Sequence, residues 1–391
     1  MATCLPACPL GIDIPGFIRF LREGDAALAL ERIKQQNPFP AICGRLCPAP
    51  CEQACVFYAE GSPISIRELE RFAADFGQTN TKKGTGPLKS GDQSLSKKVA
   101  VIGSGPAGMS AAYYLARANL DVTIFEAAHE PGGLLRYGVP EFRLPQQVLD
   151  EQFAQLKSLG IEVQTDAVFG RTLFKDELLM RGFSAVLIAS GAALPRFSAL
   201  VGSDLAGVYY DTEFLYRLQS ISKEDALNAG REQKIASPQV VVIGRGQAAF
   251  DAARLSLRLG SQVQMVFEGF EEEIGVSPEV LQESREEGLE IQAMKVLEIV
   301  GDQKGFVQGV LAQKLDIVEG ADGLKLEASS TEPVLLEAQA VIIANGQVPN
   351  DFFTEGITNM DKIFSIGPSS SVVEAIAAGK SISQKIIEYL K

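Results

Sequence analysis

The sequence predicts an α/β chain in which two doubly wound, Rossmann-like nucleotide-binding domains follow a small α-helical domain. Three observations support this fold class. Two segments, 97–127 and 238–269, share the order strand, glycine-rich turn, alanine-rich helix, strand and acidic residue, which is typical of dinucleotide-binding folds. Strand and helix patterns continue to alternate toward the C-terminus, as in doubly wound sheets. The segment 1–76 lacks this alternation and carries apolar residues at helical spacing.

The composition fits a folded chain of several domains. The 391 residues are 46% hydrophobic and 22% charged, which is enough apolar content for two or three cores. The formal net charge of −13 excludes a typical nucleic-acid binder, because such a protein needs a basic face. We find no signal peptide and no apolar run of the length that a membrane-spanning helix needs, so we expect no membrane span and a cytoplasmic location.

Local patterns predict the domain boundaries. Helical spacing is clear between residues 9 and 40 and again from Ser65 to Phe76. A stretch rich in Gly, Thr, Ser and Lys begins at Gly77 and is the clearest linker in the chain. We therefore expect a helical domain at 1–76, a linker at 77–97, a first nucleotide-binding domain at 98–225 and 338–391, and a second one at 226–337.

The first glycine turn reads GSGPAG over residues 103–108. Gly103 allows a tight turn, Gly105 lets a pyrophosphate approach the backbone, and Gly108 permits close helix packing. The helix that follows presents free N–H groups and its positive dipole end to the phosphates. Glu126 ends the next strand, where an acidic residue can bind ribose hydroxyls. These features together predict a dinucleotide site.

The second glycine turn reads GRGQAA over residues 244–249, and Glu268 follows the next strand. A carboxylate at that place accepts hydrogen bonds from a free 2′-hydroxyl and repels a 2′-phosphate, so we expect NADH to be preferred over NADPH. Arg245 lies inside the turn. Its side chain could contact phosphate, or it could crowd the site and leave a retained fold with a weakened nicotinamide site.

The six cysteines all lie between Cys4 and Cys55. A secreted disulfide knot would not be followed by a long cysteine-free α/β chain, so metal ligation is the better interpretation. Thiolates spaced C-x₃-C-x₃-C suit iron–sulfur or zinc alike. Their place next to a nucleotide-binding fingerprint favours an iron–sulfur centre, since structural zinc sites usually use C-x₂₋₄-C pairs set further apart.

The chain has one histidine, His129, and no G-x-S-x-G serine elbow. We expect His129 to be a surface loop residue and expect no catalytic side chain. Hydride transfer between two bound cofactors needs no side-chain acid or base, so this composition fits redox chemistry.

Longer motifs show a resemblance to a known family. The segments CGRLCPAPCEQAC (43–55), PISIRELERFA (63–73), PGGLLRYGVPEFRLP (131–145), GFSAVLIASGAALP (182–195) and SVVEAIAAGK (371–380) resemble the small subunit of bacterial glutamate synthase and its relatives, which include the N-terminal part of dihydropyrimidine dehydrogenase and the large subunit of NADH-dependent ferredoxin:NADP oxidoreductase. The resemblance implies FAD in the first nucleotide-binding domain, NAD(P)H in the second, and [4Fe–4S] clusters in the helical domain.

The resemblance and the glycine turns together imply the cofactor contacts. We expect them at Gly103, Gly105, Pro106, Ala107, Gly108, Glu126, Gly133, Leu134, Arg136, Val139, Arg143, Gly191, Gly244, Gly246, Gln247, Ala248, Glu268, Gly346, Ser371 and Val372.

The resemblance also implies the cluster ligands. One cluster would be held by Cys8, Cys47, Cys51 and Glu70, a complete set. A second cluster would use Cys4 and Cys55 with two cysteines upstream of Cys4, where only Met1, Ala2 and Thr3 lie. We therefore expect one cluster, with the second missing, incomplete, or completed by a partner or by Cys43.

The C-terminal region departs from the family pattern. The family has a strand, Gly-Asp, a short loop and a helix facing the flavin, whereas here IFSIG runs directly into PSSSVVEAIAAGK. The aspartate is absent, which would cost roughly 1–3 kcal/mol of FAD affinity. We still expect a helix to begin near Ser370 or Ser371, with its dipole toward the flavin.

The resemblance implies an FAD-dependent NAD(P)H oxidoreductase subunit. It would pass electrons between NAD(P)H, FAD and an iron–sulfur cluster to a larger redox subunit or a ferredoxin-like acceptor, as part of a hetero-oligomer. The alternative is a non-catalytic relay or scaffold subunit of a hydrogenase, formate dehydrogenase or ferredoxin type of complex. The incomplete second cluster, the missing aspartate and Arg245 motivate that alternative.

Overall fold

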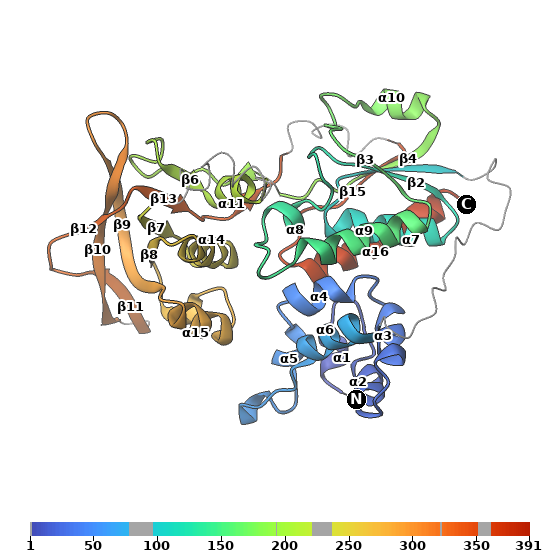
Figure 1. The fold of residues 1–391 in the computed structure, drawn as a ribbon, viewed down its shortest axis with the longest axis horizontal. Helices are drawn as coiled ribbons and strands as arrows, with labels where there is room; N and C mark the ends of the chain where they lie inside the picture. The colour runs from blue at the N-terminus through green and yellow to red at the C-terminus, as the bar shows by residue number, and fades with distance from the viewer. Residues whose placement is uncertain (1, 78–96, 193, 221–236, 321–322, 351–360) are drawn as a thin grey trace. The chain divides into compact units, whose positions relative to one another are not determined.

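A computed structural model of the chain describes residues 2–77, 97–192, 194–220, 237–320, 323–350 and 361–391 (Figure 1). Its residues form two compact units. Unit 1 comprises residues 1–136, 141–192 and 349–391, and unit 2 comprises residues 137–140 and 193–348. The predicted linker at 77–97 falls almost entirely outside the described residues, and so does the predicted boundary at 225.

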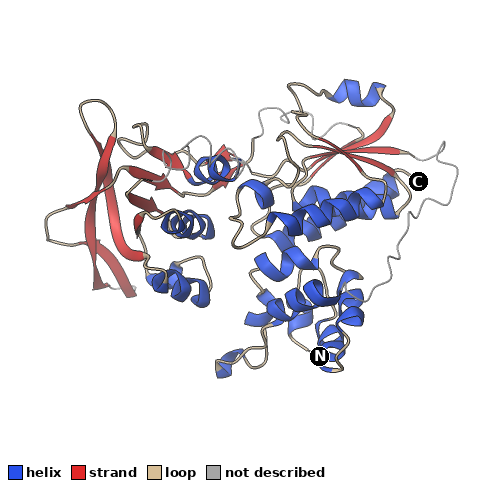
Figure 2. Ribbon diagram, viewed as in Figure 1, coloured by secondary structure: helices blue, strands red, loops and turns tan. Residues whose placement is uncertain are grey.

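The N-terminal part of unit 1 is built from short helices (Figure 2). They are α1 Cys4–Ala7, α2 Ile14–Arg22, α3 Ala26–Lys34, α4 Pro40–Leu46, α5 Pro50–Gln53, the 3₁₀ helix η1 Tyr58–Glu60 and α6 Ile66–Phe76. Side-chain hydrogen bonds cap the first turns of two of these helices. Asp13 accepts a hydrogen bond from the Gly16 N–H at 3.1 Å at the start of α2, and Asp25 accepts one from Leu28 at 2.9 Å at the start of α3. The predicted helices at 9–40 and 65–76 are confirmed.

Unit 1 continues with a five-stranded parallel sheet in the order β15-β4-β1-β2-β3. The strands are β1 Lys98–Ile102, β2 Asp121–Phe125, β3 Glu162–Gln164, β4 Phe183–Ile188 and β15 Ile363–Ser365. The helices are α7 Pro106–Arg117, α8 Leu134–Tyr137, α9 Gln146–Ser158, α10 Lys175–Met180 and α16 Val372–Tyr389. Figure 1 shows α7, α9 and α16 on one side of the sheet. The outer strands enter by crossovers, as a doubly wound fold requires.

Helices α7 and α16 pack closely because small residues face each other. A Cβ added at Gly379 would lie 2.3 Å from the carbonyl oxygen of Ala107. The Ser110 hydroxyl donates to the carbonyl of Ile376 at 2.7 Å. Helix α16 begins after Ser371, whose hydroxyl accepts from the Glu374 N–H at 3.4 Å, so the predicted helix start is confirmed.

Unit 2 contains a sheet in the order β11-β10-β9-β8-β7-β13-β6, with β12 paired to β10. The strands from β6 to β9 pair in parallel and the rest are antiparallel. The strands are β6 Val208–Tyr210, β7 Gln239–Ile243, β8 Gln262–Phe267, β9 Glu290–Gly301, β10 Val307–Gly320, β11 Gly323–Ala328, β12 Val334–Glu337 and β13 Ala340–Ile343. A separate antiparallel pair joins β5 Leu194–Pro195 to β14 Gln347–Val348. The helices are α11 Asp211–Ser220, α14 Gln247–Arg258, η4 Glu271–Glu273 and α15 Pro278–Glu286.

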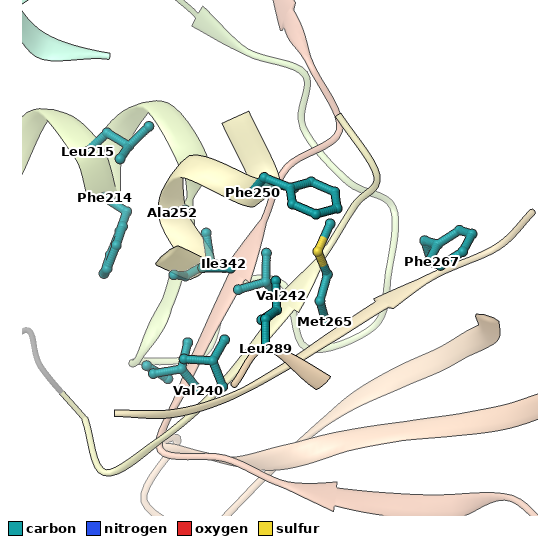
Figure 3. Packing of buried hydrophobic residues seen from close by; sticks show 14 of the residues in the cluster. Phe214, Leu215, Val240, Val242, Phe250, Ala252, Met265, Phe267, Leu289 and Ile342 are labelled. Atoms are coloured by element: carbon teal, nitrogen blue, oxygen red, sulfur yellow. The ribbon is translucent and has the colours of Figure 1, made fainter. Parts of the chain in front are cut away.

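The core of unit 2 lies between its parallel strands and the helices α11 and α14 (Figure 3). Phe214 and Phe250 come from the helices, and Val242, Met265 and Ile342 come from three strands. Burying each large apolar side chain stabilises the unit by roughly 1.5–3 kcal/mol. This core holds the two ends of the second glycine turn in place.

The two units do not coincide with the predicted domain boundaries. Strand β6 and helix α11 were predicted within the first nucleotide-binding domain, at 98–225, and β13 within 338–391. The structure places all three in unit 2, because β6 and β13 pair with each other and β13 pairs with β7. Within the described residues, no helix is long and apolar enough to span a membrane.

Candidate functional site

The predicted ligands of the first cluster line a single cavity. Cys8, Cys47, Cys51 and Glu70 form part of its wall, together with Cys43. They come from four helical segments that are distant in sequence: the end of α1, helix α4 with its end, α5 and α6. The fold therefore brings this predicted donor set together, and it adds Cys43 to the same cavity.

Prolines explain how two of these cysteines reach the cavity. Cys8 ends α1 and Cys47 ends α4, and each is followed by a proline. A residue before proline is pushed out of the helical region, and both cysteines have extended backbone, with ψ of 118° and 134°. Cys51 follows Pro50 at the first turn of α5. Each thiol is thus carried by a helix end whose geometry proline determines.

A glycine brings α4 and α6 close together beside this cavity. A Cβ added at Gly44 would lie 2.6 Å from the backbone of Arg71. Gly44 follows Cys43 on α4, and Arg71 follows Glu70 on α6. The close approach therefore brings the thiol-bearing helix next to the carboxylate-bearing one.

Asn37 holds Glu70 in place. Its amide N–H donates to Glu70 Oε1 at 2.7 Å, and its oxygen accepts from the Phe39 N–H at 3.0 Å. Because the Phe39 N–H can only donate, it determines which end of the amide faces Glu70. Both side chains are buried. Sequence reasoning missed Asn37; the only signal was an asparagine before Pro-Phe-Pro, just after a helix.

Burial governs the protonation of these groups. It raises the pKa of Glu70 to about 8, against the opposing hydrogen bond from Asn37. Burial, with smaller contributions from neighbouring acidic groups, raises the pKa of Cys47 and of Cys51 to about 12. Burial therefore disfavours the ionised form of these donors unless a positive charge lies nearby.

The donor set fits an iron–sulfur cluster. Thiolates are the usual cluster ligands, and a positively charged iron centre offsets the cost of ionising buried thiols. Within the described residues, no three His, Cys, Asp or Glu side chains are arranged to hold a single metal ion. The donors instead surround a cavity.

The predicted ligands of the second cluster also come together. Cys4 and Cys55 line a second cavity with Thr3, Ile18 and other residues of α2. The Thr3 hydroxyl donates to the carbonyl of Ala54 and so ties the N-terminal turn to the end of α5. Burial raises the pKa of the Cys4 thiol, and the nearby Cys55 adds to this shift. Cys43, one of the alternatives for completing a second cluster, lines the first cavity beside Cys8 and Cys47.

The first glycine turn has the geometry of a dinucleotide turn. Gly103 has a φ of +104°, and an added Cβ would lie 2.5 Å from the Ala189 carbonyl oxygen. A Cβ at Gly108 would lie 2.0 Å from the Gly103 carbonyl oxygen. At Gly105, in contrast, no atom lies within 4 Å of the added Cβ. This open space before Pro106 and Ala107, at the start of α7, is what a pyrophosphate needs.

Glu126 is tied to this turn by Ser104. Its Oε2 accepts from the Ser104 N–H at 3.0 Å and from the Ser104 hydroxyl, and its Oε1 accepts from the Ala128 N–H at 2.9 Å. The Ser104 hydroxyl also accepts from the Gly132 N–H at 2.8 Å. A carboxylate has about four acceptor sites, so Glu126 keeps capacity for a ribose hydroxyl.

The segment 131–137 lies against the same turn. A Cβ added at Gly133 would lie 3.2 Å from the Cα of Gly105. Arg136 is buried, and its guanidinium donates to the Pro131 carbonyl at 2.8 Å, to Gln146 at 2.9 Å and to Asp150 at 2.5 Å. Arg136 thus holds the loop that lies against the glycine turn. Leu134, at the start of α8, is 39% exposed and available for contact.

The other predicted FAD contacts are spread over several elements. Gly191 follows β4 with a φ of +66°. Arg143 is half-buried in the segment before α9. Ser371 and Val372 begin α16, and the next residue, Val373, lines the first cysteine cavity. Val139 belongs to unit 2, where its carbonyl accepts from the Gln219 side chain.

The second glycine turn repeats the first in backbone form. Gly244 has a φ of +152°, and an added Cβ would lie 2.6 Å from the Ala344 carbonyl oxygen. Gly246 precedes α14 and has open space around it. Gln247 and Ala248 begin α14, where the Gln247 amide donates to Asp251 at 3.1 Å. Gly346, with a φ of +87°, lies just before β14.

The side chain of Arg245 reaches the end of β8. Its Nη1 donates to the Glu268 carbonyl oxygen at 3.1 Å and to Glu273 Oε2 at 2.7 Å. Glu268 itself is exposed. The predicted nucleotide-discriminating position and the unusual arginine are therefore neighbours. His129 is exposed in a loop, as predicted, with Nδ1 3.5 Å from Asp166 Oδ2.

Two family models match the chain. Residues 1–82 match the dihydropyrimidine dehydrogenase domain II, 4Fe-4S cluster, and residues 97–367 match the pyridine nucleotide-disulphide oxidoreductase family. The chain therefore belongs to the pyridine nucleotide-disulphide oxidoreductase family. The predicted resemblance and the predicted fold class are both confirmed.

Named relatives agree with this assignment. The chain is 29% identical to the NADP(+)-dependent formate dehydrogenase subunit beta of Moorella thermoacetica, with 100% of this chain and 60% of that protein covered. It is 37% identical to the glutamate synthase [NADPH] small chain of Mycobacterium tuberculosis, over 68% of this chain and 54% of that one. It is 30% identical to the NAD-dependent dihydropyrimidine dehydrogenase subunit PreT of Escherichia coli, over 100% and 91%.

The chain thus spans only 60% and 54% of the lengths of the first two relatives. Among solved structures, FprA from Mycobacterium tuberculosis is similar in fold, with a TM-score of 0.60, 19% identity, and 75% of this chain and 85% of that one covered.

Proposed function

We propose that this chain is an electron-transfer subunit that exchanges electrons between NAD(P)H, FAD and one [4Fe–4S] cluster and delivers them to a larger redox partner. One observation supports the proposal: the first turn of α16, where flavin contacts are predicted, also lines the cysteine cavity. Ser371 and Val372 are the proposed flavin contacts, and Val373 lines the cavity of Cys8, Cys47 and Cys51. A flavin and a cluster bound there would be close neighbours within unit 1.

The FAD site would be formed by the first glycine turn and the segment beside it. Gly105 leaves open backbone for the pyrophosphate, Glu126 offers an acceptor to the ribose, and Gly133 closes one side. The α7 N-terminus, next to Pro106 and Ala107, favours the phosphate charge. A bound flavin would supply the exchange between two-electron hydride chemistry and single electrons.

The cluster site would be formed by Cys8, Cys47, Cys51 and Glu70. Asn37 holds the Glu70 carboxylate through Oε1, which leaves its other oxygen for iron. A buried, mixed thiolate–carboxylate set tunes the potential of a cluster through its charge and hydrogen bonds. Cys4 and Cys55 supply two of the ligands that a second cluster needs.

Unit 2 would bind NADH in preference to NADPH. Glu268 is exposed at the end of β8, where a carboxylate accepts from a 2′-hydroxyl and repels a 2′-phosphate. The names of the relatives include NADP-, NADPH- and NAD-dependent proteins. The coenzyme preference therefore differs among the relatives, and the residues of each chain determine it.

The partner would be a larger redox subunit or a ferredoxin-like acceptor. The relatives from Moorella thermoacetica and Escherichia coli are named as subunits, and the one from Mycobacterium tuberculosis as a small chain. We propose a hetero-oligomer with a cytoplasmic location. The chain's own residues bind and orient the cofactors, and none is proposed as an acid or base.

The test is to purify the full chain anaerobically and measure flavin, iron and the absorption spectrum. NADH and NADPH are then added separately. We expect about one FAD and about four irons per chain, and flavin bleaching by NADH at lower concentration than by NADPH. Bound FAD with no bleaching by either nucleotide would contradict the proposal. Tighter bleaching by NADPH would contradict only the coenzyme preference.

Matched variants test the ligand set. Glu70→Ala should change the iron content or the electron paramagnetic resonance (EPR) signal of the reduced protein. Glu68→Ala, an exposed residue on the same helix, should not. Equal spectra for the two variants would remove Glu70 from the ligand set.

The alternative function, a relay subunit without nicotinamide chemistry, has one observation in its favour. The Arg245–Glu273 ion pair lies beside the position where the ribose of a dinucleotide would bind. In that case the protein would hold flavin and iron and take up electrons from a reduced partner, but not from NADH.

A further inference from the structure

The side chain of Arg245 connects the two parts of the second glycine turn that recognise a dinucleotide. Its backbone lies between Gly244 and Gly246, where a pyrophosphate would bind, and its carbonyl accepts from the Gly275 N–H at 2.8 Å. Its Nη1 lies 3.1 Å from the Glu268 carbonyl oxygen, at the end of β8. In dinucleotide folds that strand end faces the 2′ position of the adenosine ribose.

Glu273 holds Arg245 there. Its Oε2 accepts from Arg245 Nη1 at 2.7 Å and from the Phe270 N–H at 3.1 Å. The bond from the Phe270 N–H fixes the position of the Glu273 carboxylate, so the carboxylate is already in place for Arg245. The two side chains remain 43% and 49% exposed and are within reach of a ligand.

The chain makes room for this ion pair with a glycine. Gly269 has a φ of +152°, and an added Cβ would lie 2.1 Å from Arg245 Nη1 and 2.5 Å from Glu273 Oε2. Any other residue at 269 would displace the pair. The arrangement is therefore a feature of the local backbone as well as of two exposed side chains.

The charges at this strand end are predominantly negative. Glu268, Glu271, Glu272 and Glu273 follow one another closely, and the arginines that pair with this segment are Arg245 and Arg285, which contacts Glu271 at 2.8 Å. An arginine near the ribose accommodates a 2′-phosphate, and a carboxylate disfavours it. Arg245 is thus the arginine that contacts the nucleotide-discriminating position, Glu268. The carboxylate of Glu273 already neutralises the charge of Arg245.

We propose that Glu273 is a specificity-determining residue: by pairing with Arg245, it withholds that guanidinium from a 2′-phosphate and maintains the preference for NADH. This inference rests on the proposed function, since it requires that unit 2 binds NAD(P). It predicts that the preference depends on an ion pair and not on Glu268 alone.

The experiment uses the full-length, FAD-loaded protein and the oxidised coenzymes, which bind without reducing the flavin. Dissociation constants for NAD⁺ and NADP⁺ are measured by calorimetry for the wild type, Glu273→Gln, Arg245→Ala and the double variant. Glu272→Gln is the matched control, because it removes one charge from the same exposed segment without breaking the pair.

We expect Glu273→Gln to strengthen NADP⁺ binding about tenfold, the effect of one charge-assisted hydrogen bond to phosphate, with less than about threefold change for NAD⁺. The gain should disappear in the double variant. Glu272→Gln should change the ratio by less than about threefold.

Two outcomes would overturn the inference while leaving the proposed function intact. An equal gain in Glu272→Gln and Glu273→Gln would assign the effect to general charge. A full gain in the double variant would exclude Arg245 as the phosphate ligand. Absence of binding of either coenzyme to the wild type would instead contradict the proposed function on which the inference depends.

Discussion

The polar groups of the two units are held in different ways. In unit 1 the acids at the candidate sites are buried and fixed by neutral hydrogen bonds: Asn37 donates to Glu70, and Ser104 donates to Glu126. In unit 2 the corresponding groups are exposed and held by charge, as in the pair of Arg245 and Glu273. Exposed ion pairs contribute little stability and adapt to ligands, whereas buried hydrogen-bonded groups are costly to disturb.

The two glycine turns show this difference at equivalent positions. Ser104 and Arg245 each follow the first glycine of their turn, and each contacts an acidic side chain. The serine is short and binds the acid that ends the adjacent strand. The arginine is long, and its side chain passes the position that follows the strand, Glu268, to pair with Glu273. The residue between the two glycines, Ser104 or Arg245, thus decides which acidic side chain the turn contacts.

The largest expected effect tests how tightly the first turn is packed. Gly108→Ala would place a Cβ 2.0 Å from the Gly103 carbonyl, so we expect about 3 kcal/mol of destabilisation of unit 1 and loss of FAD. Thermal unfolding followed by flavin fluorescence would measure it. Unit 2 already carries Ala249 at the equivalent position. The control Ala249→Gly should cost only about 1 kcal/mol, and equal costs would contradict the comparison.

The next prediction challenges the comparison, because unit 2 also contains buried acids, among them Asp211. Burial raises the pKa of Asp211 to about 6, with hydrogen bonds from Thr212 and Gln347 opposing the shift. Among the residues that the structure describes, Oδ2 has no hydrogen-bond partner. A raised pKa means that the folded state binds the proton more tightly. The stabilisation is therefore complete below about pH 4 and is lost as the pH rises through about 6.

The effect should approach about 3 kcal/mol between these limits. It is measured as the difference in the free energy of unfolding between the wild type and Asp211→Asn at pH 4 and pH 7. Asn cannot titrate, so the variant should lose this pH dependence. Parallel pH profiles for the two proteins would show that Asp211 does not titrate in this range.

The third prediction concerns the hydrogen bond that positions Glu70. Asn37→Ala removes the donor to Glu70 Oε1 and the acceptor for the Phe39 N–H. We expect about 2 kcal/mol of destabilisation of the iron-free protein, and a shifted EPR signal of the reduced, reconstituted protein. The EPR signal shows whether Asn37 positions Glu70 at the cluster or only contributes to packing. A variant that lost stability but kept the wild-type signal would make Asn37 a purely structural residue.

The smallest expected effect is that of the exposed ion pair on stability. Arg245→Ala and Glu273→Gln should each change the free energy of unfolding of unit 2 by less than about 1 kcal/mol, because both side chains are half-exposed. Urea titration followed by circular dichroism would measure it. A cost as large as that expected for Asn37→Ala would mean that unit 2 relies on this pair as unit 1 relies on its buried bonds.

Several features of the site were predictable because their signals are local. The glycine turns, the acids at the strand ends and the helix start at Ser371 depend on residues within one turn of the chain. The grouping of cysteines near the N-terminus predicted metal ligation, and the resemblance implied the donor set of Cys8, Cys47, Cys51 and Glu70, which line one cavity.

Other features could not be read from spacing, because long-range packing decides them. Arg136 has the motif position of a cofactor contact, yet its guanidinium is used within the loop and by α9. The position of Cys43 in the first cavity could not be predicted either, since it depends on the crossing of α4 and α6 at Gly44. The domain boundaries shifted because β13 pairs with β6 and β7 across a long sequence separation.

By itself, the sequence determined the fold class, the two glycine turns and the chemical type of the donors, because hydrophobic periodicity, glycine placement and cysteine content act over a few residues. Only the tertiary structure decided which donors meet. Asn37 lies 33 residues from Glu70, and Arg245 lies 28 residues from Glu273. Such pairs form when helices and strands pack, and no local pattern specifies that packing.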